Sequence, residues 1–570
     1  MPLEDGMVSR MHSVVHDALN AVQTWLGEPY FAGSQLLILT AGAVSIGDEP
    51  IDDIAAAAVW GLVRSAQSED PERILLADTD TDGVPELRGL VAQVLAAGEP
   101  QVAIRKGVVH TARATRLPAT ANTGTETELR ARLSVGSVVI TGGTGGLGAM
   151  IARHLVSAYG ARSLILASRR GRSAPGATET VAELTALGAR VTLLACDVST
   201  RSGVEALIAA VPQDAPLVGV VHTAGVLDDG VVSSLTPQRV DTVLAAKADA
   251  AWWLHEATRD LDLALFVLYS SAAGTLGTAG QGNYAAANTF LDALAEFRCA
   301  RGAAAVSIAW GLWDTAVGMG ARLRGEDTTR LGRDGILALT PEQGLSWFDT
   351  ALVGGQATVI AARLDLSVLS GATVVPSILR GLIRANRRAV DHTATAVDGV
   401  PELQQRILGL PETEALQRVL DTVRLQVARV LGHEGIGTVD PDRNFRELGF
   451  DSLTAVEIRN QLNAVTGLRL PTTLVFDYPS PRVVAEHILV QFDKTAPRER
   501  LDSAVDEKNI RDYLATVPLS ELRRIGMLDS VLALMADAHI ADIDTVVEQE
   551  LTDDMDIEAL IQHVIDNRID

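Results

Sequence analysis

The chain has little cysteine, few aromatic residues and a deficit of basic residues. Cys196 and Cys299 are the two cysteines among 570 residues, which excludes a disulfide framework and is typical of proteins from a reducing compartment. Lys and Arg total 48 against 72 Asp and Glu, so the formal net charge is -24. Because phosphate binding needs a basic surface, nucleic acid is not an expected partner.

The sequence also lacks the features that direct a chain to or across a membrane. No uninterrupted apolar run is long enough to span a bilayer. The first residues, 1–5, do not have the basic and apolar regions of a signal peptide. We therefore expect a cytoplasmic protein without a membrane partner, and no motif in the chain predicts a metal site.

The length predicts several domains, because one domain usually covers about 100–200 residues. Changes in composition along the chain suggest two larger α/β parts, then a small helical part and a helical, acidic tail. Polar linkers are expected at 119–134 and near 387–399. The expected domain ranges are 1–118, 134–375, 412–490 and 507–570.

The first 118 residues mix helix and strand patterns without a complete catalytic motif. Val14–Leu26 and Ala55–Ser68 are predicted as helices, and Gln35–Thr40 as a buried strand. A structural role is the better interpretation of this part. It lacks the first strands of an α/β unit, so we expect that the chain either is truncated there or begins at an unusual point.

Residues 135–366 alternate apolar, strand-like runs with helical segments. Such alternation predicts a doubly wound α/β fold, in which a parallel sheet has helices on both faces. The predicted strands are Val138–Ile140, Ser163–Ala167, Val191–Ala195, Val218–His222, Leu265–Tyr269 and Ala305–Ala309.

A glycine-rich turn follows the first of these strands and precedes a helical pattern. Glycines allow the backbone to approach a pyrophosphate, and the N-terminus of the next helix favours negative charge. A glycine-rich turn alone is weak evidence, but the position between strand and helix is the context that a dinucleotide site requires. The candidate residues are Thr141, Gly142, Gly143, Thr144, Gly145, Gly146, Leu147 and Gly148.

The ends of the next strands suggest which dinucleotide binds. Ser168, Arg169 and Arg170 follow the second strand, where an NAD site usually has an acidic residue. Arginine instead pairs with a 2′-phosphate, so NADPH is the predicted cofactor, with two surface arginines as the alternative. Asp197 would contact the adenine, although a lone aspartate is more often a cap. Further candidates from these strand ends are Val198, Thr223, Ala224 and Gly225.

A second set of residues indicates the reaction. Ser271 precedes Tyr284 by 13 positions, and the residue four positions after the tyrosine is Asn288. This pattern resembles the short-chain dehydrogenase/reductase superfamily, most members of which have lysine at that last position. Here the lysine lies upstream, at Lys247, an exchange that is similar to the ketoreductase domains of modular polyketide synthases.

The resemblance implies a role for each of these four side chains in reducing a ketone. Tyr284 would donate the proton, and Ser271 would hold the carbonyl oxygen by a hydrogen bond. Lys247 would contact the ribose and lower the tyrosine pKa, which is ordinarily about 10. Asn288 would orient Lys247 or a water. NADPH would supply the hydride.

A short segment bears on the stereochemistry of the product. Leu227, Asp228 and Asp229 resemble the Leu-Asp-Asp motif of B-type ketoreductases, whereas an A-type enzyme would have tryptophan at the position of Leu276. The resemblance implies a 3R (D) hydroxyl. Ala286 stands where epimerising B-type enzymes have proline, which implies no epimerisation. Without the surrounding motifs, an exposed loop would be the preferred interpretation of the two aspartates.

The small helical part contains a second motif, Gly449-Phe-Asp-Ser452-Leu, at the start of an apolar-periodic helix. It resembles the attachment site of acyl carrier proteins, in which a phosphopantetheinyl transferase adds 4′-phosphopantetheine to the serine. The phosphate would lie near a helix N-terminus. A capping serine is the alternative for Ser452. The resemblance implies a four-helix carrier domain and a substrate held as a β-ketoacyl thioester.

The acidic C-terminal segment has one amphipathic stripe, formed by Ile557, Leu560, Ile561, Val564 and Ile565. A solvated helix is the general interpretation. Together with a helical pair at Ile510–Met535, the segment resembles docking domains at the ends of polyketide synthase subunits. Such a tail implies a homodimer and a downstream synthase subunit as partner.

Two alternatives remain at this point. A free-standing short-chain reductase would act on a diffusible substrate, but the carrier motif argues against it. A catalytically silent scaffold would keep the fold only for carrier docking, but the four intact residues of the ketone-reducing set argue against that.

Overall fold

The computed structural model describes residues 6–31, 33–47, 49–80, 87–117, 123–314, 335–371, 375–383, 402–433 and 435–495. The predicted linker near 387–399 and the predicted docking tail at 507–570 lie outside these residues. No helix in the described ranges has the length and apolar character needed to cross a membrane.

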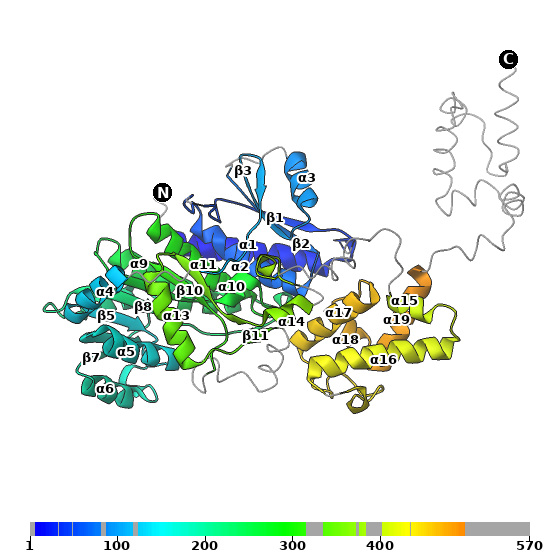
Figure 1. Cartoon of the computed structure of the whole chain (residues 1–570). Helices are drawn as coiled ribbons and strands as arrows, with labels where there is room; N and C mark the ends of the chain where they lie inside the picture. The colour runs from blue at the N-terminus through cyan, green and yellow to red at the C-terminus, as the bar shows by residue number, and fades with distance from the viewer. Residues whose placement is uncertain are drawn as a thin grey trace, which may run out of the picture. The chain divides into compact units, whose positions relative to one another are not determined.

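The larger sheet has seven strands in the order β12-β10-β9-β8-β5-β6-β7, and each pairs in parallel with its neighbours (Figure 1). All six predicted strands are present, and β12 was not predicted. The bounds are β5 Ser137–Thr141, β6 Ser163–Ser168, β7 Arg190–Ala195, β8 Leu217–His222, β9 Leu265–Ser271, β10 Val306–Trp310 and β12 Thr358–Ala361.

Alternate residues of these strands are buried on opposite faces of the sheet. Val139 and Val220 belong to one apolar cluster, whereas Val138 and Val221 belong to the other. Side chains on a strand alternate between the two faces, so this pattern means that both faces are covered. The doubly wound fold is therefore confirmed. The covering helices include α5 Gly146–Tyr159, α6 Ala177–Ala186, α7 Arg201–Ala209, α8 Pro237–Leu244, α9 Ala250–Thr258, α11 Gly282–Cys299 and α13 Pro341–Val353.

The N-terminal part forms a second, smaller sheet in the order β1-β2-β3-β4. Its first three strands are parallel, and β4 is antiparallel to β3. The two predicted helices and the predicted strand are present, but the strand was expected to be buried and its residues are partly buried or exposed. The bounds are α1 Met7–Gly27, β1 Leu36–Ala41, α2 Ile54–Glu69, β2 Ile74–Thr79, α3 Leu87–Ala97, β3 Gln101–Arg105 and β4 Val108–His110.

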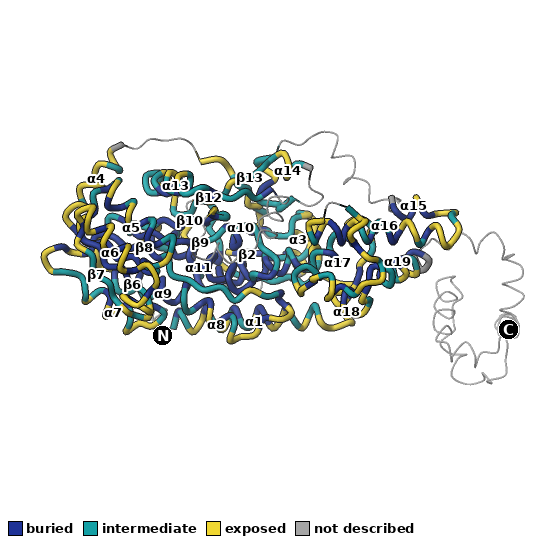
Figure 2. The backbone as a smooth tube through the Cα atoms, turned by 90° about the horizontal axis from the view of Figure 1, so that it is seen from below, coloured by how far each residue is buried: buried dark blue, intermediate teal, exposed yellow. Residues whose placement is uncertain are grey.

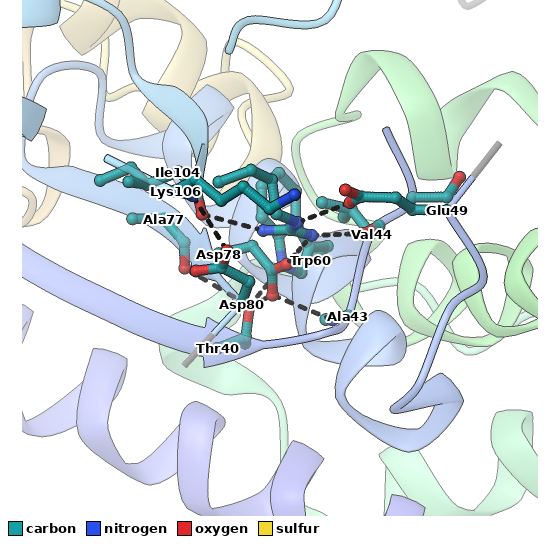
Figure 3. A network of polar contacts seen from close by, with 12 residues as sticks. Thr40, Ala43, Val44, Glu49, Trp60, Ala77, Asp78, Asp80, Ile104 and Lys106 are labelled. Atoms are coloured by element: carbon teal, nitrogen blue, oxygen red, sulfur yellow. Dashed lines mark hydrogen bonds and ion pairs between the residues drawn. The ribbon is translucent and has the colours of Figure 1, made fainter. Parts of the chain in front are cut away.

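A buried ion pair fills the carboxyl ends of the strands of this smaller sheet (Figure 3). Arg105 donates from Nη2 to Oδ2 of Asp78 at 2.7 Å, and the Asp78 side chain is fully buried. The other carboxylate oxygen accepts from Thr40 Oγ1 at 2.6 Å and from the Ala43 amide at 2.9 Å. Burying a charge is costly unless it is paired and hydrogen-bonded. The network meets both conditions, and it occupies the edge at which a nucleotide binds in comparable sheets.

Helix α2 joins the two sheets into one core. Its residues are buried over most of its length, and it packs closely against α11, next to which it is drawn in Figure 1. Helix α11 is also buried over most of its length and is largely dark blue in Figure 2. At Gly61, an added Cβ would lie 2.2 Å from the Ala285 carbonyl oxygen, so the two helix backbones touch there. The N-terminal part is therefore packed directly against the helix that carries Tyr284.

The predicted linker at 119–134 is wrong for most of its length. Helix α4 runs from Thr123 to Val135 and buries Leu129 and Leu133 against the larger domain. The many threonines and glutamates of this segment suggested a loop, but its two leucines lie four residues apart. They therefore share one helix face, which packs into the core.

Four α-helices begin within the described residues of the predicted carrier range 412–490, and they are α16 Glu412–Leu431, α17 Ser452–Thr466, α18 Leu474–Asp477 and α19 Pro481–Thr495. A further helix, α15 Glu402–Ile407, precedes this range and packs against α16 and α17. Val419, Val423 and Val427 form the buried stripe of α16. Ile458 and Leu462 are buried from α17. The predicted four-helix architecture is confirmed.

Candidate active site and carrier site

A pocket of about 680 Å³ lies at the carboxyl ends of the central strands of the larger sheet. Predicted residues from the ends of four strands, β5, β6, β7 and β8, line it together, which is the usual position of a dinucleotide in such a sheet. The lining residues are Gly142, Thr144–Gly148, Ala167–Arg170, Cys196–Ser199, Thr223–Val226, Thr242, Ala245 and Ala246.

Glycines shape the floor of this pocket. Gly142 has φ of +66°, and a Cβ there would lie 2.8 Å from the Thr223 hydroxyl oxygen. A Cβ on Gly148 would lie 2.4 Å from the Gly142 carbonyl oxygen. Helix α5 begins behind the turn, and no side chain caps its N-terminus. Its first N–H groups are therefore available to an anionic group, as a pyrophosphate requires.

The structure separates the predicted pocket residues into those that line it and those that support it. Thr141 and Gly143 do not line the pocket. Thr141 is buried, and its carbonyl oxygen accepts from the Thr223 hydroxyl at 2.7 Å. Sequence reasoning missed Thr242, Ala245 and Ala246, because only residues that follow a strand were considered. Thr242 lies in helix α8, and Ala245 and Ala246 lie in the helical turn after it.

Arg169 and Arg170 lie exposed at the rim of the pocket. Because these side chains are exposed, their charge carries no desolvation penalty, and they can contact an anion at this rim of the pocket. Asp197 lines the same end, but its Oδ1 accepts from the Ser199 amide at 3.1 Å and from the Ser199 hydroxyl at 2.8 Å. Asp197 therefore stabilises the turn after β7, and this contact leaves its second carboxylate oxygen for another donor. The alternative of a helix cap is wrong, because the N-cap of α7 is Thr200.

The four residues of the predicted catalytic set lie together beside the pocket. Lys247 Nζ donates to Asn288 Oδ1 and, at 2.6 Å, to the Tyr269 carbonyl oxygen. Asn288 Nδ2 donates to the Tyr284 carbonyl oxygen at 2.7 Å, one helical turn earlier. The Lys247 ammonium lies 5.0 Å from the centre of the Tyr284 ring. The side chains of Ser271 and Asn288 lie near enough to the Tyr284 phenol to lower its pKa by hydrogen bonding.

The backbone around Lys247 is unusual. Residues Ala245–Asp249 form a π-helical turn between α8 and α9. Such turns widen a helix locally and are frequent at functional sites. Lys247 is buried there, with its Nζ directed at Asn288 from a different helix. The sequence offers no marker for this turn.

Burial dominates the electrostatics of the set. It raises the pKa of Tyr284 to about 12, although hydrogen bonds from Asn288 and Ser271 act in the opposite direction. Burial also lowers the pKa of Lys247 to about 7, and the nearby Asp292 partly opposes that change. The expectation that Lys247 lowers the tyrosine pKa is not met, because its ammonium is engaged by Asn288 and Tyr269 and does not contact the phenol oxygen.

His222 is a residue of the site that sequence reasoning missed. Its Nδ1 lies 2.7 Å from the Thr141 hydroxyl, and its Nε2 lies 3.0 Å from the Lys247 carbonyl oxygen. Burial lowers the pKa of His222 to about 3, so the imidazole is neutral. It therefore connects the strand before the glycine-rich turn to the π-helical turn of Lys247. The polar ending of an otherwise apolar β8 was the available signal.

The segment with the two aspartates is held by specific contacts. Asp228 Oδ1 accepts from Arg239 Nε at 2.9 Å, and Asp229 Oδ2 accepts from Gln281 Nε2 at 2.9 Å. Gly230 and Gln281 form a parallel bridge. Leu227 is partly buried against the core. The segment is thus tied to the residues that immediately precede Tyr284.

Ser452 is the first residue of α17, and it is exposed. The cap of this helix is Asp451, whose carboxylate accepts from the Leu453 amide at 3.1 Å and from the Thr454 amide at 2.9 Å. The alternative of a capping serine is therefore wrong. The Ser452 hydroxyl lies at a helix N-terminus, where a phosphodiester is electrostatically favoured.

Three family models match the chain. They are "KR domain" over residues 136–315, "Polyketide synthase extender module SpnB, Rossmann fold domain" over 1–114, and "Phosphopantetheine attachment site" over 421–488. The ketoreductase domain implies NADPH, and the attachment-site domain implies a covalent phosphopantetheine. The glycine turn and exposed arginines fit the first, and the exposed Ser452 fits the second.

Curated relatives are much longer than this chain. Polyketide synthase GfsA of Streptomyces halstedii is 45% identical over 540 residues, which cover 92% of this chain and 7% of that protein. Mycoketide-CoA synthase of Mycobacterium tuberculosis is 46% identical over 442 residues, which cover 76% of this chain and 11% of that protein.

Solved structures cover the reductase part. A structure described as an A-type ketoreductase from a modular polyketide synthase is 40% identical and has a TM-score of 0.57, with 65% of this chain and 77% of that chain covered. The first ketoreductase of the tylosin synthase is 38% identical with a TM-score of 0.54, with 62% and 76% covered. The chain therefore belongs to the ketoreductases of modular polyketide synthases, and its ketoreductase is followed by a phosphopantetheine carrier domain.

Proposed function

We propose that the chain reduces the β-keto group of a carrier-bound polyketide thioester to a 3R (D) hydroxyl with NADPH, without epimerising the α carbon. The observation that carries this proposal is the arrangement around Tyr284. Its buried phenol interacts with Ser271 and Asn288, beside a pocket with the shape and donors of a dinucleotide site.

Each side chain has a role that follows from its chemistry. Tyr284 is protonated at neutral pH, so it can donate a proton to the oxygen of the reduced ketone. Ser271 directs the carbonyl oxygen toward that phenol. Asn288 orders the Lys247 side chain and also bonds to the carbonyl oxygen of Tyr284, so it fixes the helical turn that carries the phenol. NADPH supplies the hydride when it is bound.

The preference for NADPH over NADH rests on Arg169 and Arg170. Both lie at the rim of the pocket, after the strand whose end faces the adenosine ribose in related sheets. A guanidinium pairs in a planar fork with phosphate oxygens. Loss of either arginine should therefore affect only the cofactor that carries a 2′-phosphate.

The B-type stereochemistry rests on the segment Leu227–Asp229 and on the identities of Leu276 and Ala286. The contact from Asp229 to Gln281 places this segment at the side of the residues before Tyr284. Because the two parts are hydrogen-bonded to each other, a shift of this segment would also shift the residues before Tyr284. The segment is thus suited to select the face of the ketone that receives the hydride.

The tether explains how the substrate is supplied. A phosphopantetheine arm on Ser452 would keep the thioester at a high effective concentration near the reductase. A phosphopantetheinyl transferase would install the arm. The homodimer, transfer to a downstream subunit through 507–570, and a cytoplasmic location complete the proposal.

The test is reduction of a β-ketoacyl thioester by the purified chain, followed by chiral analysis of the product. The proposal expects oxidation of NADPH in preference to NADH and one dominant product, the 3R alcohol. NADPH left unconsumed would favour a scaffold that docks carriers. A dominant 3S alcohol would refute the B-type assignment. Removal of residues 507–570 should leave reduction intact and slow transfer to the downstream subunit.

A further inference from the structure

Helix α2 of the N-terminal part contacts the peptide that joins the two central catalytic residues. The peptide comprises residues 272–283, between Ser271 and Tyr284. Four α2 side chains hydrogen-bond to its backbone, and they occupy positions i, i+1, i+4 and i+5, on one face of the helix. The contacts are Arg64 Nη1 to the Gly274 oxygen at 2.9 Å, Ser65 Oγ to the Thr278 oxygen at 2.5 Å, Ser68 Oγ to the Gly277 oxygen at 3.2 Å and the Gly280 amide to Glu69 Oε1 at 2.9 Å.

Glu69 differs from the other three residues because it is a buried carboxylate that accepts two backbone hydrogen bonds. It is 3% exposed, and its second oxygen, Oε2, accepts from the Val232 amide at 2.8 Å. Val232 follows the Leu227–Asp229 segment. One buried carboxylate from the N-terminal part therefore holds both peptides that border the phenol, although they lie 163 and 211 positions away in the chain.

The two peptides also bond to each other at the point where Glu69 holds them. The Gly230 amide donates to the Gly280 oxygen at 2.7 Å. Gly277 fits this arrangement only without a side chain, because a Cβ there would lie 2.5 Å from the Arg64 oxygen. The peptide before Tyr284 is thus shaped from one side by α2 and from the other by the segment of the two aspartates.

We propose that Glu69 is a positioning residue of the reductase, which acts through the Gly280 and Val232 amides to set the geometry of Tyr284 and the side from which the ketone enters. The N-terminal part is then a determinant of turnover and of stereochemical fidelity as well as a support for the fold. The stereochemical half of this inference rests on the B-type assignment proposed above.

The physical reason is that a buried carboxylate can satisfy two N–H donors at once. Glu69→Gln keeps the shape of the side chain but has one acceptor oxygen, and its NH₂ group faces the other amide. One backbone N–H then loses its partner in the interior, which favours a shift of that peptide. Displacements of about 1 Å near reacting groups can reduce a rate by about 100-fold.

The experiment compares the wild-type chain, Glu69→Gln and Glu72→Gln, which changes an exposed glutamate three residues further along. We expect Glu69→Gln to lower kcat by about 10- to 100-fold. The KM for NADPH should stay unchanged, because Glu69 does not line the dinucleotide pocket. The minor alcohol stereoisomer should increase. Glu72→Gln should match the wild type in all three measurements.

A second variant, Ser65→Ala, keeps the inference testable if Glu69→Gln does not fold. It removes one hydrogen bond from the same row and leaves a small apolar group in a buried position. It should show the same pattern at smaller size, a lower kcat with an unchanged KM for NADPH. Wild-type kcat and product ratio in folded Glu69→Gln would overturn the inference, as would an unaltered Ser65→Ala if Glu69→Gln does not fold. A wild-type chain that reduces no thioester would instead refute the proposed function.

Discussion

Replacing Tyr284 by phenylalanine removes the proposed proton donor and almost nothing else. The ring is 8% exposed and stays in place, because the phenylalanine keeps every carbon of the side chain. Positioned general acids contribute about 10²–10⁴ to a rate. We therefore expect kcat for thioester reduction to fall by at least about 100-fold, or about 3 kcal/mol in activation free energy.

A matched control lies on the neighbouring strand. Tyr269 is also buried, and its hydroxyl has no hydrogen-bond partner among the residues that the structure describes. Tyr269→Phe makes the same chemical change without touching the phenol that faces Ser271. Its rate should stay within a few-fold of the wild type. Its stability should be equal or higher, because a buried, unpaired hydroxyl costs about 1–3 kcal/mol.

The assay is single-turnover reduction of a β-ketoacyl thioester at saturating NADPH, followed by the loss of NADPH absorbance. The pH dependence gives a second check, because burial raises the pKa of Tyr284 to about 12. The protonated phenol is the active form, so loss of that proton should not reduce the wild-type rate below about pH 10. Near-normal turnover in Tyr284→Phe, or an equal loss in Tyr269→Phe, would refute the assignment of Tyr284 as donor.

Three further predictions concern the cofactor, the carrier and the buried carboxylate. Arg169→Ala should raise the KM for NADPH by at least about tenfold and leave that for NADH unchanged, as measured by initial rates; equal losses would exclude Arg169 as the phosphate contact. Ser452→Ala should abolish the mass increase that coenzyme A and a phosphopantetheinyl transferase produce, and persistent modification would point to another serine. Burial raises the pKa of Glu69 to about 7 from 4.5, although its two amide donors act in the opposite direction. Its protonated form therefore contributes stability below about pH 4.5 that is lost as pH rises through 7, and the carboxylate that accepts both N–H groups is the major form above about pH 7. Relative to Glu69→Gln, the wild type should therefore lose up to about 3 kcal/mol of unfolding free energy between pH 4.5 and 8.5, measured by urea titration of the reductase transition, and a difference independent of pH would contradict the raised pKa.

Local patterns were sufficient to predict six of the seven strands of the larger sheet and the pocket at its edge. Apolar runs of five or six residues, each followed by a helical pattern, place the strand ends on one side of a parallel sheet. Residues that immediately follow those strands, such as Gly142 and Thr223, are brought together by that topology alone. The motif residues Ser271, Tyr284, Lys247 and Asn288 were predicted from a resemblance, and the structure places them side by side.

The features that were missed depend on contacts between distant parts of the chain. Helix α4 has a polar composition, and only the packing of Leu129 and Leu133 into the core explains why this segment is a helix. The π-helical turn that directs Lys247 at Asn288 has no sequence marker. The pKa of Tyr284 was expected to fall because a cation is near, yet burial acts more strongly than a lysine that is already paired. Burial and pairing are properties of the packed core, which local patterns do not report.

The two sheets of this chain show what separates a binding sheet from a supporting one. Both are built largely of parallel strands with helices packed against them, and a parallel sheet offers a ligand site at the carboxyl ends of its strands. In the larger sheet, glycines keep side chains out of that edge, and a pocket results. In the smaller sheet, the Arg105–Asp78 pair fills it, with Thr40 and the Ala43 amide as further partners. The smaller sheet therefore contributes to the reductase site through its helix α2, on the side of the helix that faces the larger sheet. On that side Glu69 contacts the peptides beside Tyr284.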